Sequence, residues 1–206
     1  MEHVELQLFT VDQNAHNFGV TGTQAIACLL DRLHPEKVFS TPLLTFQSDS
    51  CTATFRTSGI TRIDLVSKEP PTWPLHFGLA GASQVTEEKF IEELGRAHSA
   101  ERRNPHVDTA VTLVELALVN RRRIYVRLET LNSAWNEVGA ATMMQRMLEA
   151  PSYHFRRHEG GVVILNAANV IHADFHPGLP NLPGACRAEP MLGGGSLVTA
   201  YAAVET

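Results

Sequence analysis

The sequence predicts an α+β protein of two lobes, residues 1–74 and 75–206, with an antiparallel or mixed sheet wrapped around a buried helix in each lobe. Two observations favour this class. Short runs of alternating apolar and polar residues follow one another without a regular helix between them, which argues against a doubly wound parallel sheet. The segment Gly19–Leu33 is typical of a helix that is apolar on several sides, and such a helix needs protein around it.

The first lobe is predicted to consist of strands around this helix. Alternation of Ile63 and Leu65 with Arg62 and Asp64 is typical of a half-buried strand. The predicted strands are Glu5–Thr10, Leu43–Gln47, Thr52–Thr57 and Thr61–Val66, with a turn at Asp12–Asn17. The segment Lys68–Pro74 breaks every periodicity, so we place the lobe boundary there.

The second lobe is predicted to begin with a helix, Thr86–Arg96, which Thr86 caps. A β-hairpin follows, with strands Val111–Val119 and Arg123–Leu128. The remaining predicted elements are a helix at Ser133–Glu149, strands at Gly161–Asn166 and Val170–Phe175, a loop at Gly178–Gly184 and an apolar helix at Ser196–Val204.

Composition excludes several classes of protein. The chain has 206 residues, 44% hydrophobic and 19% charged, which is too apolar for a disordered chain. The net charge of −5, with Arg121–Arg123 the one small basic cluster, argues against a nucleic-acid partner. No apolar run approaches the ~20 residues that cross a bilayer, and the charged start MEHVELQLF does not fit an export signal. We therefore expect a soluble, cytoplasmic protein whose Cys28, Cys51 and Cys186 are free thiols.

Two glycine-containing turns, Phe18–Thr23 and Leu192–Ser196, are each predicted to open a buried helix. Helix N-termini expose N–H groups and suit carboxylates, but tight turns and close packing are the more frequent reason for such glycines. His172, Asp174 and His176 would share one strand face, which is more typical of a polar face than of a metal site. We predict no metal.

The order of the motifs resembles the phenazine-biosynthesis isomerase (PhzF-like) family, which has the diaminopimelate-epimerase fold. Leu8–Thr10 followed by Gly19–Thr21 and the Ala-containing helix is similar to that family's first glycine segment. Further segments follow in the family's order: Leu44–Phe46, Ile63–Leu65, Arg123–Leu128, Val162–Leu165, Asp174–His176 and Ala188–Pro190 with Gly193. The resemblance implies two lobes with a ligand in the cleft between them.

The chain also departs from that family. It is shorter, because the front third of the first lobe, which carries the catalytic glutamate, and the last strands of the second lobe have no counterpart. The histidine of the family's first motif falls at Val20, its aspartate at Glu189, its serine at Gly194 and its late histidine at Ser196. The family's proton shuttle is therefore not carried over intact.

The candidate catalytic residues are Glu189, which falls on a family active-site position, with His16 or Asp12 from the loop before the first helix. The candidate ligand-binding residues are Gly19, Val20, Thr21, Gly193, Gly194, Gly195 and Ser196. These residues predict a cofactor-independent isomerase or cyclase acting on a small organic molecule, either carboxylate-bearing or a secondary metabolite. The alternative is a non-catalytic relative that binds a ligand or completes a complex. Because the missing strands would leave sheet edges exposed, we expect a homodimer or a partner subunit that covers them.

Overall fold

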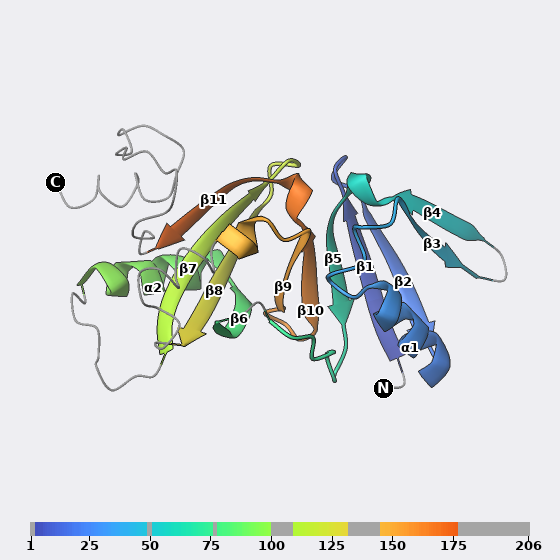
Figure 1. Cartoon of the computed structure of the whole chain (residues 1–206), viewed down its shortest axis with the longest axis horizontal. Helices are drawn as coiled ribbons and strands as arrows, with labels where there is room; N and C mark the ends of the chain where they lie inside the picture. The colour runs from blue at the N-terminus through green and yellow to red at the C-terminus, as the bar shows by residue number, and fades with distance from the viewer. Residues whose placement is uncertain (1–2, 49–50, 76–77, 100–108, 132–144, 177–206) are drawn as a thin grey trace.

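Strand pairing organises the part of the chain that the computed structural model describes, residues 3–48, 51–75, 78–99, 109–131 and 145–176 (Figure 1). Nine strands form one mixed sheet in the order β11-β7-β8-β6-β9-β10-β5-β1-β2, and β3 and β4 form a separate hairpin. In the described residues the helices are α1 (Thr23–Arg32), α2 (Glu87–Ser99) and a helical turn at residues 145–148. The α+β class is therefore confirmed. No helix among the described residues has the length and apolar character needed to cross a membrane.

The strands are mostly antiparallel neighbours. Their bounds are β1 (His3–Thr10), β2 (Ala15–Thr21), β3 (Leu43–Gln47), β4 (Thr52–Arg56), β5 (Ile60–Val66), β6 (Leu79–Val85), β7 (Thr109–Leu118), β8 (Arg123–Leu131), β9 (Ser152–Arg156), β10 (Val162–Asn166) and β11 (Val170–His176). Among the described pairs, β6 and β9 run parallel, and a single register pair, Ser83 with Arg156, joins them. This junction is the most weakly paired point of the sheet.

Two large apolar clusters lie on opposite faces of the sheet. The first lies between β1, β5 and β10 and the covering helix α1, and it includes the buried Leu6, Ile26 and Ile63. The second lies between β7, β8 and β9 and includes Val114 and Phe155. A smaller cluster joins α2 to β7 and β8.

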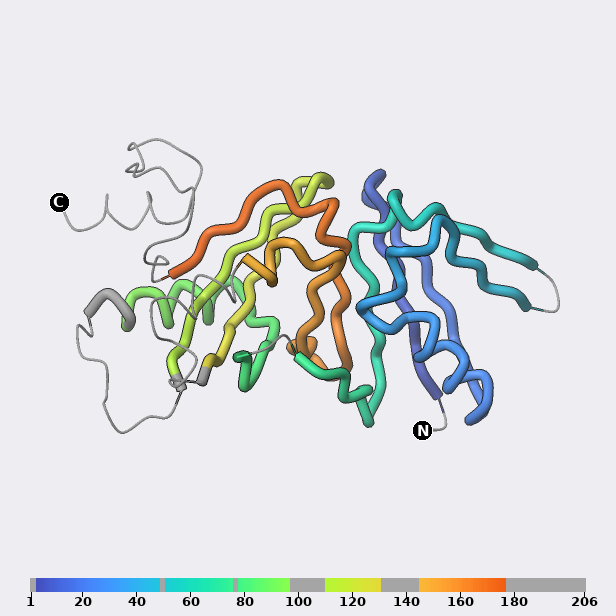
Figure 2. The backbone as a smooth tube through the Cα atoms, viewed as in Figure 1, coloured from blue at the N-terminus to red at the C-terminus, as the bar shows by residue number. Residues whose placement is uncertain are grey.

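Strand β10 belongs to both large clusters. Val162 and Ile164 face the first cluster, whereas Val163 and Leu165 face the second. Because successive side chains of a strand point to opposite faces, one apolar run serves both cores. β10 also pairs with β5, so a strand from the predicted second lobe completes the sheet of the first, as the backbone trace in Figure 2 shows. The division into lobes 1–74 and 75–206 stays a prediction.

Buried amides lock the two short 3-10 turns at residues 57–59 and 167–169 together. Asn166 Nδ2 donates to the carbonyl oxygens of Thr57 and Ile60, both at 3.1 Å. Asn169 Nδ2 donates to the carbonyl oxygens of Ser58, at 3.2 Å, and Ile60, at 2.8 Å. These bonds satisfy backbone carbonyls in and beside the first turn, and they connect segments more than a hundred residues apart.

Most predicted strands are confirmed, and so is the hairpin β7–β8 with its turn around Asn120–Arg122. The helix predicted over Gly19–Leu33, buried all round, is wrong in both extent and environment. Its first three residues belong to β2, α1 begins at Thr23, and Ile26 and Leu29 are its buried residues. The alternation of His16, Phe18 and Val20 with smaller or polar residues was a strand signal.

Three strands, β2, β6 and β9, were not predicted, whereas the predicted helix at Thr86–Arg96 is confirmed as α2. Of the predicted helix Ser133–Glu149, the described residues 145–148 are helical. The loop Gly178–Gly184 and the helix Ser196–Val204 lie outside the described residues.

Candidate functional site

Asp12 lies in the tight turn between β1 and β2 and is occupied by local contacts. Its carboxylate accepts hydrogen bonds from the Thr10 hydroxyl and from Asn14 Nδ2, the latter at 2.7 Å. The Thr10 hydrogen bond, followed by those of Asn14, lowers the pKa of Asp12 below its usual 3.8. These contacts are typical of a turn-stabilising aspartate, because each holds the loop and leaves the carboxylate ionised.

His16 packs against the β3–β4 hairpin. Its ring meets Phe55 edge-on at 4.9 Å between centroids. Gly19, Val20 and Thr21 lie in the extended strand β2, before the start of α1, so they do not form the helix N-terminus that the sequence predicted. Their contact with a ligand stays a prediction. Glu189, Gly193, Gly194, Gly195 and Ser196 lie outside the described residues.

The polar residues of β11 do not form a metal centre. His172 Nε2 lies 2.9 Å from Asp174 Oδ2, while the His176 ring faces Phe90 at 6.1 Å. Across the described ranges, no group of three His, Cys, Asp or Glu side chains is placed to hold a metal ion.

A buried carboxylate lies beside this strand. Glu115 is 2% exposed and pairs with Arg123, and its cross-strand neighbours are Asp174 and Tyr125. Burial raises the pKa of Glu115, and the Arg123 guanidinium opposes that rise. Burial and the charge of Glu115 raise the pKa of Tyr125 to about 12. Both pKa values are thus shifted upward by the low polarity of the sheet face that α2 covers.

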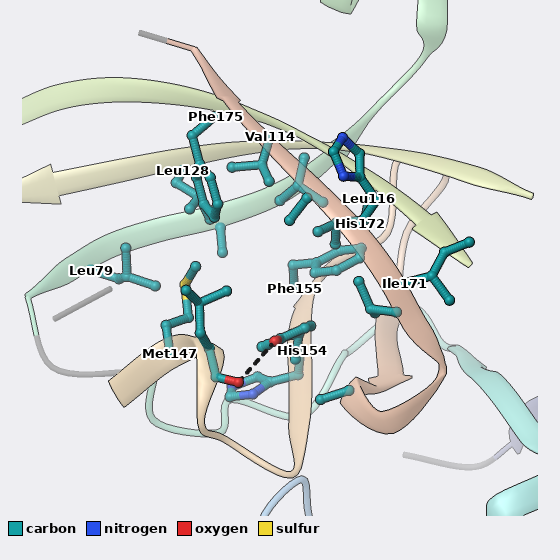
Figure 3. Close-up of a pocket in the computed structure, with 17 residues that line it drawn as sticks. Leu79, Val114, Leu116, Leu128, Met147, His154, Phe155, Ile171, His172 and Phe175 are labelled. Atoms are coloured by element: carbon teal, nitrogen blue, oxygen red, sulfur yellow. Dashed lines mark hydrogen bonds between the residues drawn. The ribbon is translucent and has the colours of Figure 1, made fainter. Parts of the chain in front are cut away.

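The opposite face of the same strands carries an apolar pocket of about 270 Å³ that is partly open to solvent (Figure 3). Its walls come from β6, β7, β8, β9 and β11 and from the helical residues 145–148. The apolar lining consists of Leu79, Ala82, Val114, Leu116, Val126, Leu128, Met147, Leu148, Phe155, Ala167, Val170, Ile171, Ala173 and Phe175. We call this cavity the apolar pocket. Strands position most of its walls, so its shape is set by backbone pairing.

Three polar side chains also line the apolar pocket: Tyr153, His154 and His172. The Tyr153 hydroxyl donates to the Leu148 carbonyl at 3.5 Å, and burial raises the pKa of the Tyr153 phenol. His172 is more than half exposed and lies at the margin, away from His154 (Figure 3). The pocket thus offers a large apolar surface and few polar groups, the usual composition of a small-molecule site.

The sequence contained a signal for this pocket that the prediction missed. Ser152–Arg156 places Tyr153 and Phe155 on one face and His154 on the other, which is the alternation of a strand. His154 and His158 stand at helical spacing, although Pro151 and Gly160 crowd them, and no strand was predicted over this segment. Without β9, the second cluster has no wall opposite β7 and β8.

Comparisons with protein-family models, with curated proteins and with solved structures gave no match to the chain. The resemblance to the phenazine-biosynthesis isomerases therefore stays a prediction that rests on the order of short motifs.

Proposed function

We propose that the chain binds a small, mainly apolar organic molecule in the apolar pocket. The observation that carries this proposal is the pocket itself, about 270 Å³ of space in the second apolar cluster. The pocket is concave, mainly apolar and open to solvent at one side, which is the usual form of a site for a small molecule. A cavity of roughly 150 Å³ admits benzene, so this one suits a molecule of about two fused rings.

The binding test uses an uncharged fluorescent probe, N-phenyl-1-naphthylamine, titrated into the full chain. We expect a saturable rise in fluorescence with a blue shift, because the probe leaves water for an apolar wall. Ala173→Leu fills the pocket and should weaken binding at least tenfold. Ala53→Leu is the matched control, because Ala53 is also a partly buried strand alanine but does not line the pocket. Non-saturable fluorescence, or equal binding by both variants, would reject the proposal.

An isomerase or cyclase reaction is a second proposal. Tyr153 and His154, adjacent in β9 and both lining the pocket, supply groups able to donate or accept protons. The family resemblance implies a form of this reaction in which the ligand lies between two lobes and Glu189 acts with His16 or Asp12. The two apolar clusters on either side of β10 support the presence of two lobes. The test incubates small carboxylic acids with the protein in D₂O and follows loss of their C–H signals by NMR. Exchange that Tyr153→Phe reduces would support catalysis in this pocket, and no exchange would leave binding as the function.

We also propose that the chain forms a homodimer through strand β2. β2 ends the nine-stranded sheet, and its sequence Ala15–Thr21 carries no Lys, Arg, Asp or Glu. Edge strands that lack charge and proline are open to pairing with another chain. A second copy of β2, antiparallel about a two-fold axis at Phe18, would place Asn17 opposite Gly19 of that copy.

A further inference from the structure

A second cavity, of about 420 Å³, lies on the other side of the β6–β9 junction. The connector between β5 and β6 covers it through Trp73, and β6 and β9 supply Ser83 and Arg156. Trp73 meets the His154 ring edge-on at 6.3 Å between centroids. Unlike the apolar pocket, this cavity contains charged side chains, Glu129 and Arg156. We call it the Trp73 cavity.

The two cavities share a wall of three residues, Ala82, His154 and Phe155. The wall coincides with the weakest seam of the sheet, where Ser83 and Arg156 form the single register pair of β6 and β9. Continuing that parallel register places Ala82 beside Phe155 and Gly81 beside His154, so the β6 side of the seam is built from small residues. Figure 3 shows His154 at the edge of the apolar pocket, next to Phe155.

We propose that the two cavities form one binding site for an amphipathic organic carboxylate. The apolar body of the ligand occupies the apolar pocket, and its carboxylate lies in the Trp73 cavity beside Arg156. The part of the ligand that joins the two passes His154 at the seam. This inference rests on the proposed function and names the class of ligand.

Arg156 is the group of the Trp73 cavity that suits an anionic end group, because the carboxylate in the lining, Glu129, already has a partner. Glu129 is paired with Arg127, which also lies 3.4 Å from Glu93. In contrast, no carboxylate of the described residues forms an ion pair with Arg156. Arg156 is therefore the charged group of the cavity lining that has no ion-pair partner among the described residues. A guanidinium offers two parallel N–H donors that match a carboxylate, and the Ser83 hydroxyl lies in the same cavity as a further donor.

Isothermal titration with a matched ligand pair tests this inference. The probes are 2-naphthylacetic acid, ionised at neutral pH, and its uncharged methyl ester. We expect the acid to bind wild type about tenfold more tightly than the ester. Arg156→Gln should weaken binding of the acid about tenfold and leave binding of the ester unchanged. Arg156→Lys keeps the positive charge but lacks the two parallel N–H donors, so its affinity for the acid should lie between those of wild type and Arg156→Gln. Arg56→Gln is the control, because Arg56 is exposed and lines neither cavity.

The possible outcomes separate the two proposals. If wild type binds acid and ester equally, or Arg156→Gln binds the acid as tightly as wild type, the carboxylate site is overturned while the apolar pocket keeps its function. If neither compound binds and N-phenyl-1-naphthylamine also fails to bind, the proposed function fails and the carboxylate site fails with it.

Discussion

Arg62 donates two hydrogen bonds to the carboxylate of Asp64, from Nε to Oδ1 at 2.5 Å and from Nη2 to Oδ2 at 2.6 Å. Both residues lie on one face of β5, and Asp64 is 1% exposed. Arg157 approaches the same carboxylate, with its Nε 3.3 Å from Oδ2. The carboxylate is thus removed from water and compensated by two guanidinium groups.

Arg62→Met should lower the free energy of unfolding by about 3 kcal/mol, measured by urea denaturation, because it leaves a buried carboxylate with one partner. Arg96→Met is the control. Arg96 forms an exposed i,i+4 pair with Glu92, and pairs of that kind contribute about 0.5 kcal/mol or less. Equal losses in the two variants would contradict the role of burial.

Gly161 should tolerate no side chain. Its φ of +100° disfavours other residues, and a Cβ there would lie 1.9 Å from the Leu65 carbonyl oxygen. Its neighbour Gly160 has a similar φ of +95°, but a Cβ there would meet nothing within 4 Å. Gly160→Ala should therefore cost about 1–2 kcal/mol of unfolding free energy, the cost of the conformation alone. Gly161→Ala should cost clearly more, because β5 must also move; a similar cost in both variants would show that the contact relaxes freely.

Replacing Asn166 should destabilise the protein, because its side-chain N–H groups donate to the backbone carbonyls of Thr57 and Ile60. Its Nδ2 serves two carbonyls, and its Oδ1 accepts from the Ala168 N–H at 3.1 Å. Asn166→Ala should lower the free energy of unfolding by about 2–4 kcal/mol, since buried backbone groups lose their partners. Asn166→Asp keeps the shape and the acceptor but loses the N–H donors, so it should not restore stability. Asn17→Ala, at an exposed position of β2, should change stability by less than about 0.5 kcal/mol.

Glu115 should make stability fall as the pH rises. Its pKa is raised above 4.5 in the folded state, so between the unfolded and folded pKa values the folded state binds more protons. The free energy of unfolding therefore loses this contribution through that window. Glu115→Gln removes the titration, so the stability of the variant relative to wild type should increase as the pH rises through the window between the unfolded and folded pKa values. Urea denaturation at a series of pH values above 4.5 measures this change.

Asp12→Asn provides a control of opposite sign. The lowered pKa of Asp12 adds stability above its unfolded pKa, which is lost as the pH falls. Relative to wild type, this variant should lose stability as the pH rises. Slopes of the same sign for the Glu115 and Asp12 variants would contradict one of the two assignments, and the sign itself would show which.

Self-association through β2 is tested by paired charge substitutions. Under the proposed two-fold pairing, Asn17→Lys with Gly19→Lys places like charges opposite each other, whereas Asn17→Lys with Gly19→Glu places opposite charges there. Sedimentation equilibrium at low micromolar concentration should show a wild-type dimer, a monomer for the first variant and a dimer for the second. A monomeric wild type would rule out this interface.

The sequence predicted those elements whose defining interactions lie between residues close together in the chain. The hairpin β7–β8 was predictable because alternation and a short turn define it within the single stretch Thr109–Leu131. Strand β2 was missed because glycine at 19 and 22 and the adjoining apolar helix made a single longer helix an equally good reading. Short apolar runs are ambiguous between helix and strand when the partner strand is not known.

The pocket was less accessible to prediction than the strands. Leu79, Val114, Phe155 and Phe175 come from four strands spread over about a hundred residues, and no local spacing brings them together. The predicted site drew instead on glycine turns, of which Gly19–Thr21 lies in an edge strand and the second lies outside the described residues. The structure brings together His154 and Trp73, a pair that no motif had linked.

The position of β10 has a consequence for biosynthesis. Residues 162–166 supply Val162 and Ile164 to a core otherwise built by residues 4–65. During synthesis on the ribosome, the first apolar cluster lacks strand β10 and stays incomplete until about a hundred residues beyond β5 have been added and have emerged. Pairings of such sequence separation slow folding, because the entropy of loop closure precedes any gain from contact. During that interval the open side of β5 is the surface that a chaperone would shield.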